Sequence, residues 1–291
     1  MTFYRVKLFT DKEMHKDDKD YCLNDEHSLV GIGWGNENCT DIDDYLLNIV
    51  PKLKETCKNF CSPYECMMEM SDKSFVWTKI NGLEYALGKV EGDLFIDKNR
   101  PRMGAVRVCK WKKIAFDDVP GKITNYFVGG GRTLVRMDIS ESLKEYCIWL
   151  YNGKKGKVDN INLNDLIHYD DLEDLLGLYL QSKGYYIYPS TNKLASKSIE
   201  YELINKNTKK RACVQCKTGN DVVSDKELFS RFKDYEIFIS TTLNVSYENY
   251  SQREDKKGVT TISTEVLWEW AFLNREILPK RIQNYISILK G

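Results

Sequence analysis

Histidine is scarce in this sequence of 291 residues, which contains only three. Nucleases that work through histidine, and hydrolases with a Ser-His-Asp triad, therefore have few candidate residues here. The sequence also lacks a long uninterrupted apolar run, and its N-terminal residues show no secretion signal. We therefore expect a cytoplasmic protein that does not enter a membrane.

The formal net charge is zero, because 43 Lys and Arg residues balance 43 Asp and Glu residues. The total gives no indication of a nucleic-acid partner, but the charges are unevenly distributed. Residues 98–136 contain ten basic residues and only two acidic ones. This segment could form a DNA-binding face or an ordinary solvated surface. Its candidates for contacts with DNA phosphates are Lys110, Lys112, Lys113 and Arg132.

The nine cysteines are an odd number in a chain without a secretion signal, which favours free thiols over disulfides. Cys213 and Cys216 have the spacing of half a zinc site or of a redox motif. Alternation along a strand would place these two thiols on opposite faces, so both interpretations are poor. We expect buried free thiols.

Length and composition favour two folded domains. The chain opens with strand patterns at residues 3–9 and 28–34, separated by a charged segment, 11–26, that we expect to be an unpacked loop. A helix capped by Thr40 follows, and Pro51 should kink or interrupt it.

Short strand patterns return between residues 74 and 136, with a turn at Asn81-Gly82. Ser142 and Glu145 form a candidate capping box for a further helix. We therefore expect an α+β domain with a small bent sheet or open barrel. The predicted boundaries are 1–140 for this domain, 141–162 for a helix and linker, and 163–291 for the second domain.

The second domain mixes helix and strand, which predicts an α/β sandwich. A helix is expected over residues 170–182, and strands at 185–189, 199–204 and 211–217. An amphipathic helix over 225–235, two short strands and a long helix from about residue 265 complete the pattern.

The last two of these strands should pair through a turn at residues 205–210. Because side chains alternate along a strand, Cys213, Gln215 and Lys217 share one face of theirs. Glu200 and Glu202 share a face of the other strand by the same rule.

Two neighbouring strands could therefore bring a carboxylate, an amide oxygen and an ammonium group to one point. Hydrolysis of a phosphodiester with a divalent metal requires such oxygen ligands, and a lysine can assist the attacking water or stabilise charge on the phosphate. The alternative is a surface hairpin with mixed charges, and the spacing alone leaves both open.

The run from Asp170 to Ser240 resembles Mrr-like restriction endonucleases of the PD-(D/E)xK superfamily. It has a helix that carries Glu, the phrase KGYY, a strand with acidic residues and then Gln-x-Lys. The resemblance implies a restriction-endonuclease-like fold in the second domain and a site that binds Mg²⁺ or Mn²⁺.

Carried over to this sequence, the resemblance assigns Glu173, Glu202, Gln215 and Lys217 as the catalytic residues. The first three would be metal ligands, with Glu200 as the alternative to Glu202. This chain departs from the motif because no Pro-Asp precedes the hairpin and Gln215 replaces an acid. These departures leave the number of metal ions open.

The first domain resembles the EVE and YTH-like group of PUA-related domains, through GIGWG, FVWTKINGLEYALGKVEGD, VRVCKWKKI and VPGKITNYFVGGGRTLVRM in order. Such domains accept a flipped, modified base between aromatic rings. The candidates are Trp34 and Trp77, followed by Tyr85, Trp111 and Phe127, although each of these aromatics could instead be a core residue.

Together the two resemblances imply a type IV, modification-dependent restriction endonuclease that cuts DNA carrying a modified base, such as methylcytosine, in phage defence. Since a duplex has two strands and each chain one active site, a homodimer is expected. Two alternatives remain: a non-catalytic protein that binds modified nucleic acid, and an RNA-directed nuclease or toxin.

Overall fold

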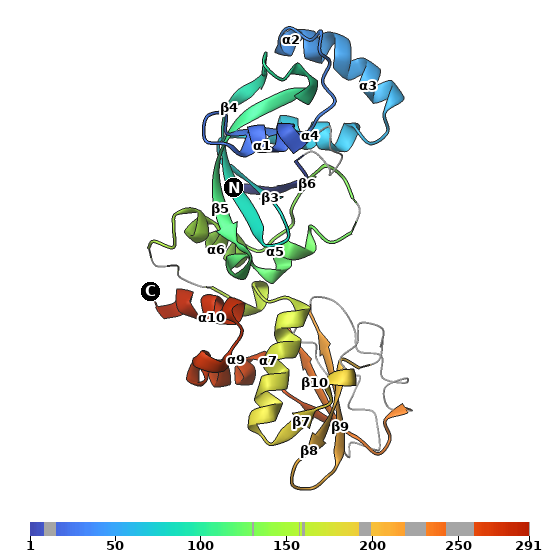
Figure 1. The fold of residues 1–291 in the computed structure, drawn as a ribbon, viewed down its shortest axis with the longest axis vertical. Helices are drawn as coiled ribbons and strands as arrows, with labels where there is room; N and C mark the ends of the chain where they lie inside the picture. The colour runs from blue at the N-terminus through green and yellow to red at the C-terminus, as the bar shows by residue number, and fades with distance from the viewer. Residues whose placement is uncertain are drawn as a thin grey trace. The chain divides into compact units, whose positions relative to one another are not determined.

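The computed structural model describes residues 1–8, 16–129, 131–156, 158, 161–191, 199–218, 231–242 and 259–290. Two compact units make up the chain (Figure 1). Unit 1 comprises Met1–Val119 and Ile123–Ile161, and unit 2 comprises Pro120–Lys122 and Asn162–Gly291. Among the described residues, no helix has both the length and the apolar character needed to cross a bilayer.

Unit 1 is built on a six-stranded sheet curled into a half-barrel, with strand order β2-β5-β4-β3-β1-β6 (Figure 1). Neighbouring strands are antiparallel except β1 and β3, which are parallel. The expectation of a small bent sheet in an α+β unit is therefore confirmed. The strands are β1 (Thr2–Val6), β2 (Leu29–Gly31), β3 (Ser74–Lys79), β4 (Glu84–Ile96), β5 (Ala105–Ala115) and β6 (Leu134–Arg136).

One face of this sheet packs under helices and forms the main core of unit 1. Tyr4, Val76 and Cys109 lie on that face and pack in one cluster with Cys22 of α1 and Met67 of α4. The helices of the unit are α1 (Lys16–Leu23), α2 (Ile42–Asp44), a π-helical segment (Tyr45–Ile49), α3 (Val50–Thr56), α4 (Cys61–Glu69) and α6 (Glu141–Tyr151). The short helix α5 (Gly121–Asn125) spans the boundary at Ile123, with its first two residues in unit 2.

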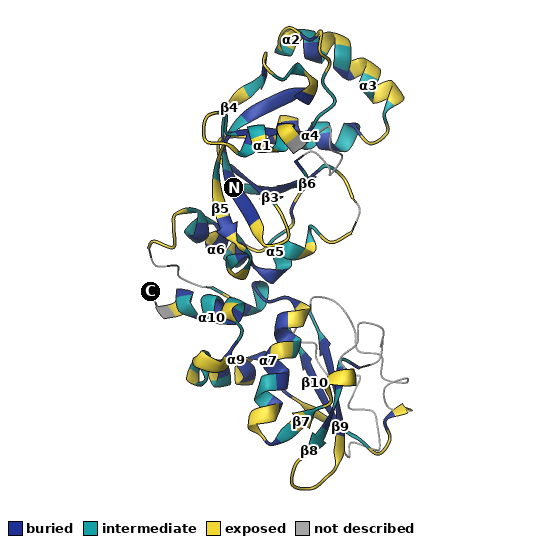
Figure 2. Cartoon of the chain, in the orientation of Figure 1, coloured by how far each residue is buried: buried dark blue, intermediate teal, exposed yellow. Residues whose placement is uncertain are grey.

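The opposite face of the sheet carries the alternate side chains of the same strands. Phe3 of β1 stacks on Phe75 of β3 with ring centroids 5.2 Å apart, and Phe75 meets Tyr151 of α6 edge-on at 5.3 Å. Arg5 and Trp77, which are paired in register, share this face and are also buried. Both faces of the sheet therefore carry buried side chains, and Figure 2 shows much of its strands in the buried colour.

The expected loop at residues 11–26 is wrong, because α1 lies within it and packs on the core. Asp18 is fully buried, and its Oδ1 accepts from Arg100 Nη1 at 3.1 Å and from Arg102 Nη2 at 2.9 Å. These partners lie more than eighty positions away, so the local charge pattern could not indicate that Asp18 would be paired and buried.

Replacing Asp18 by Asn should lower the free energy of unfolding of unit 1 by about 1–3 kcal/mol, because two charge-assisted hydrogen bonds lose their anion. The same change in Asp17, which is exposed in the first turn of α1, should alter it by less than about 0.5 kcal/mol. Urea unfolding of the full chain measures both. Equal effects of the two changes would mean that the contacts of Asp18 with Arg100 and Arg102 do not add to the free energy of unfolding.

Two helix caps differ from those expected, each by one or two residues. Asp41, not Thr40, caps α2 by accepting from the backbone N–H of Asp44. Ser140 caps α6 by accepting from the N–H of Leu143, so the Ser142–Glu145 capping box is wrong. The interruption expected at Pro51 is confirmed, since a π-helical segment precedes it and α3 begins at Val50.

Unit 2 is a mixed α/β unit around a five-stranded sheet with strand order β11-β10-β9-β8-β7. The strands are β7 (Tyr185–Ile187), β8 (Tyr201–Asn205), β9 (Arg211–Lys217), β10 (Glu236–Thr241) and β11 (Val259–Thr261). β7, β8 and β9 are antiparallel neighbours, whereas β9, β10 and β11 run parallel. The described helices are α7 (Tyr169–Ser182), α9 (Thr264–Leu273) and α10 (Lys280–Ser287).

The helix expected over residues 170–182 is confirmed as α7, and the predicted β8–β9 hairpin is confirmed in position and pairing. Most of the helix expected over 225–235 lies outside the described residues. His168 and Asp171 form a capping box at the start of α7. At Gly177 the helix packs so closely that an added Cβ would stand 3.0 Å from the Tyr201 hydroxyl.

Candidate active site

The candidate site forms around the carboxylate of Glu200, which directly precedes β8. Its Oε1 accepts from Gln215 Nε2 at 3.1 Å and from the backbone N–H of Cys216 at 3.4 Å. The ammonium group of Lys217 lies 3.8 Å from the same oxygen. Gln215 is buried, while Glu200 and Lys217 keep 17% and 27% of their side-chain surfaces exposed. The cluster is therefore held inside the fold but open to a substrate.

Glu173 joins this cluster from the second turn of α7. Burial, followed by the neighbouring charge and hydrogen bond of Glu200, raises the pKa of the Glu173 carboxyl group to about 8. At neutral pH this carboxyl group therefore keeps its proton, and it can donate a hydrogen bond to Glu200. Two facing carboxyl groups that share one proton form a place where a cation would be favoured.

The raised pKa of Glu173 predicts how stability depends on pH. Between about pH 4.5 and pH 8 the folded chain holds a proton that the unfolded chain has lost, so this group makes stability fall as pH rises through that window. Replacing Glu173 by Gln should flatten the slope and stabilise the protein most at pH 8. Urea unfolding at pH 5 and pH 8 measures the difference, and an unchanged slope would contradict the raised pKa.

Glu202 lies outside this cluster, although it shares a face of the hairpin with Glu200. It pairs in register with Cys213, and its Oε2 accepts from the Tyr235 hydroxyl at 3.3 Å. That hydroxyl in turn accepts from Arg211 Nη1 at 3.0 Å. The preference for Glu202 over Glu200 is therefore not supported by the geometry.

The sequence contained the signal that distinguishes the two acids. The backbone N–H of Asn205 donates to the carbonyl of Lys210 at 2.9 Å, and these two residues bound the predicted turn. Five positions from Asn205 toward the N-terminus is Glu200, and five positions from Lys210 toward the C-terminus is Gln215, so the two lie opposite each other. Register counted from the turn, rather than alternation alone, identifies the acid beside Gln215 and Lys217.

A divalent cation such as Mg²⁺ binds oxygen ligands, and this cluster contains several oxygen atoms. Among the residues that the structure describes, no group of three or more His, Cys, Asp or Glu side chains could hold a metal. The cluster offers the carboxylate of Glu200, the amide oxygen of Gln215 and the carboxyl group of Glu173, which would have to give up its proton to bind a cation. Mg²⁺ keeps several waters and takes one or two protein carboxylates, so these residues fit that ion.

No family model, curated protein or solved structure matches the chain. The likeness of unit 2 to Mrr-like nucleases, and of unit 1 to EVE and YTH-like domains, therefore depends on the sequence motifs alone.

The five aromatic residues proposed as a base pocket in unit 1 lie on opposite faces of its sheet. Trp34 and Trp111 pack against the core under the helices. Trp77 and Tyr85 are fully buried on the other face, where Phe127 meets the Tyr85 ring edge-on at 5.2 Å. The five therefore cannot line one pocket, and Trp77 and Tyr85 cannot stack on a base in this conformation.

The two partly exposed tryptophans also have structural roles. Trp34 has a backbone φ of 63°, in a region that residues other than glycine rarely adopt, and its ring meets Phe60 edge-on at 5.7 Å. The indole N–H of Trp111 donates to the carbonyl of Leu29 at 2.9 Å, which ties β5 to β2.

The four candidate phosphate contacts remain at the surface of unit 1, and three have partners within the protein. Lys110 pairs with Glu91 at 2.8 Å. Lys112 donates to the carbonyl of Tyr151 at 2.6 Å, and Arg132 donates to the Ser62 hydroxyl at 3.3 Å. Lys113 is exposed on β5. These interactions lie at the surface and are weak, so the basic side chains can exchange them for contacts with a phosphate.

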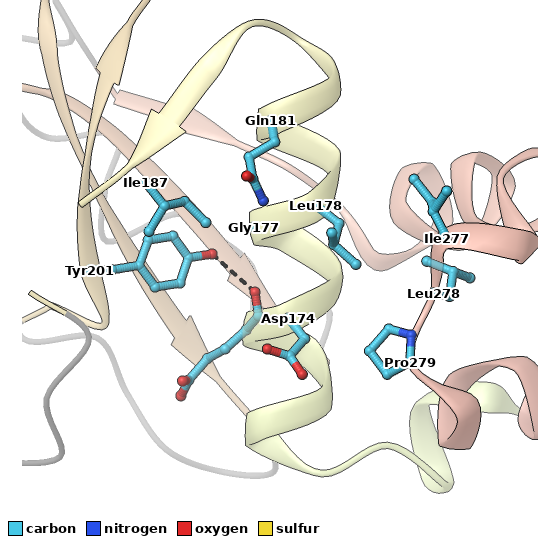
Figure 3. A pocket seen from close by; sticks show the side chains of 10 residues that line it. Asp174, Gly177, Leu178, Gln181, Ile187, Tyr201, Ile277, Leu278 and Pro279 are labelled. Carbon is cyan, nitrogen blue, oxygen red and sulfur yellow. Dashed lines mark hydrogen bonds between the residues drawn. The ribbon is translucent and has the colours of Figure 1, made fainter. Parts of the chain in front are cut away.

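A hollow of about 410 Å³ on α7 was not expected from the sequence (Figure 3). Tyr201 and Ile187 form one wall, Ile277 and Pro279 face them, and Gly177 lies between (Figure 3). The Tyr201 hydroxyl donates to the backbone carbonyl of Glu173 at 3.0 Å. The hollow therefore adjoins the turn that carries Glu173, and it has no basic residue in its lining.

Proposed function

We propose that unit 2 is a metal-dependent nuclease whose site consists of Glu173, Glu200, Gln215 and Lys217. The observation that carries the proposal is the contact of one carboxylate, Glu200, with both Gln215 and Lys217. In this site Glu200 replaces Glu202. The order of helix, hairpin and parallel strand is compatible with the restriction-endonuclease-like fold that the motifs imply.

Each residue of the cluster has a role that follows from its contacts. Mg²⁺ or Mn²⁺, held by the oxygens of Glu173, Glu200 and Gln215, would supply the charge that activates water toward a phosphate. Lys217 presents an ammonium group to the same place, where it can stabilise negative charge that develops on the phosphate. Gln215 holds the Glu200 carboxylate in position through its amide N–H.

We further propose that unit 1 recognises DNA that carries a modified base, so that the whole chain acts as a modification-dependent restriction endonuclease. The exposed basic side chains of β5 support a DNA-binding role, because they would neutralise phosphates without reading sequence. One candidate site per chain leads us to propose a homodimer for double-strand cleavage.

The test uses the purified full chain with Mg²⁺ or with EDTA. Unmodified, methylated and hydroxymethylated DNA and RNA of the same sequence are compared side by side. Metal-dependent cleavage of modified DNA supports the proposal. Cleavage of RNA alone indicates an RNA-directed nuclease, and binding without cleavage indicates a non-catalytic binding protein.

A further inference from the structure

The hollow on α7 is formed by one face of that helix and by the side chains opposite it (Figure 3). Four of its lining residues follow one another at the spacing of a single helix face, namely Asp174, Gly177, Leu178 and Gln181. Its volume of about 410 Å³ lies within the range of pockets that bind small organic molecules. Asp174 and Gln181 are exposed, so the hollow is open to solvent.

Apolar side chains make up most of the lining. They are Leu178, Ile187, Tyr201, Ile277, Leu278 and Pro279. The Tyr201 ring is fixed as a wall, because its hydroxyl donates to the backbone carbonyl of Glu173 at 3.0 Å. Ile277 on the facing wall is 59% exposed, so it has apolar surface that a bound molecule would cover.

Asp174 gives the hollow a negative charge that its lining does not balance. The described lining contains the acids Glu173 and Asp174 but no Lys, Arg or His. Arg281 acts on Asp174 electrostatically, but its guanidinium pairs with Asp171 at 3.3 Å. Partial burial, followed by the charges of Asp171 and Asp170, raises the pKa of the Asp174 carboxyl group. A bound cation would therefore stabilise the charged form of Asp174.

The lining excludes several classes of ligand. A phosphate or another anion would meet carboxyl groups and no basic side chain. A metal ion would find no side-chain oxygen on the wall that Ile277, Leu278 and Pro279 form. A neutral apolar molecule would cover the Asp174 carboxylate without giving it a partner. The lining instead suits a molecule that joins a positive charge to an apolar body.

We propose that the hollow binds a small organic cation, whose ammonium group pairs with Asp174 while its apolar part lies between the Tyr201 ring and Ile277. A hydrogen bond between an ammonium group and a carboxylate is charge-assisted and stronger than a neutral one. Although Glu173 borders both the hollow and the proposed nuclease site, the inference requires no DNA cleavage and goes beyond the proposed function.

The test uses three probes of similar size that differ in charge: 2-phenylethylamine, which is a cation, neutral 2-phenylethanol, and the anion phenylacetate. Isothermal titration calorimetry at pH 7 in EDTA measures their binding to the full chain. The amine should bind about 5- to 20-fold more tightly than the alcohol, because only the amine forms the charge-assisted pair. Phenylacetate should show no detectable binding.

Two variants and a matched control locate the bound probe. Asp174→Asn should weaken binding of the amine about 5- to 20-fold and leave binding of the alcohol unchanged. Ile277→Ala should weaken both by about threefold, because it removes apolar surface. Glu269→Gln removes an exposed acid of α9 outside the lining and should change neither. All three residues are exposed, so no variant should lower the Tm by more than about 2 °C.

Three results would overturn the inference. They are equal or undetectable binding of the amine and the alcohol by the wild-type chain, unchanged binding of the amine by Asp174→Asn, and an equal loss of amine binding in Glu269→Gln. The last result would assign the effect to the overall surface charge. Failure of the nuclease proposal is a separate outcome, because it is measured by cleavage with Mg²⁺, whereas these titrations contain EDTA and no DNA.

Discussion

Replacing Lys217 by alanine is expected to lower the rate of metal-dependent DNA cleavage about a hundred- to a thousandfold, which is typical for loss of one group that stabilises a transition state. The ammonium group lies 3.8 Å from Glu200. Its loss removes positive charge where negative charge would develop on the phosphate.

The fold should survive this change, because Lys217 lies at the end of β9 and its side chain is partly exposed. Circular dichroism and DNA affinity in EDTA should therefore match those of the wild-type chain. Lys210→Ala, in the exposed turn of the same hairpin, is the matched control and should cleave normally. Cleavage by Lys217→Ala within a fewfold of the wild-type rate would remove this site from consideration.

Replacing Glu200 by glutamine is expected to abolish detectable cleavage, whereas the same change in Glu202 should reduce the rate less than about threefold. Glu200 accepts from Gln215 and faces Lys217 and Glu173, so its charge organises the whole cluster. Glu202 instead accepts from Tyr235, away from these residues. A loss of one or two orders of magnitude or more is usual when a metal ligand is removed.

The pair of variants also has a readout that does not depend on catalysis. Isothermal titration calorimetry with Mn²⁺ should show weaker Mn²⁺ binding for Glu200→Gln and unchanged Mn²⁺ binding for Glu202→Gln. If Glu202→Gln is the inactive variant and Glu200→Gln cleaves normally, the register that joins Glu200 to Gln215 is not the functional one. Loss of activity in both would place the metal between the two acids.

Local patterns in the sequence predicted much of unit 2 correctly. Alternation along the β8–β9 hairpin and the apolar spacing of α7 are properties of neighbouring residues, so they can be read without the fold. The choice between Glu200 and Glu202 needed the register, which the turn at Asn205 and Lys210 sets.

Other outcomes depended on residues far apart in the chain. Whether Asp18 is buried is decided by Arg100 and Arg102. The parallel pairing of β1 with β3 determines that Trp77 and Arg5 share a covered face. No local pattern contains such pairings.

The sequence by itself determined the helices and strands with strong periodicity, and the polar face that carries Gln215 and Lys217, because backbone geometry repeats over a few residues. Only the tertiary structure decided which acid reaches that face, which aromatics are buried, and that Arg5 is buried. These outcomes depend on packing and electrostatics between distant segments, and the free energy of a buried charge is set by all the groups that surround it.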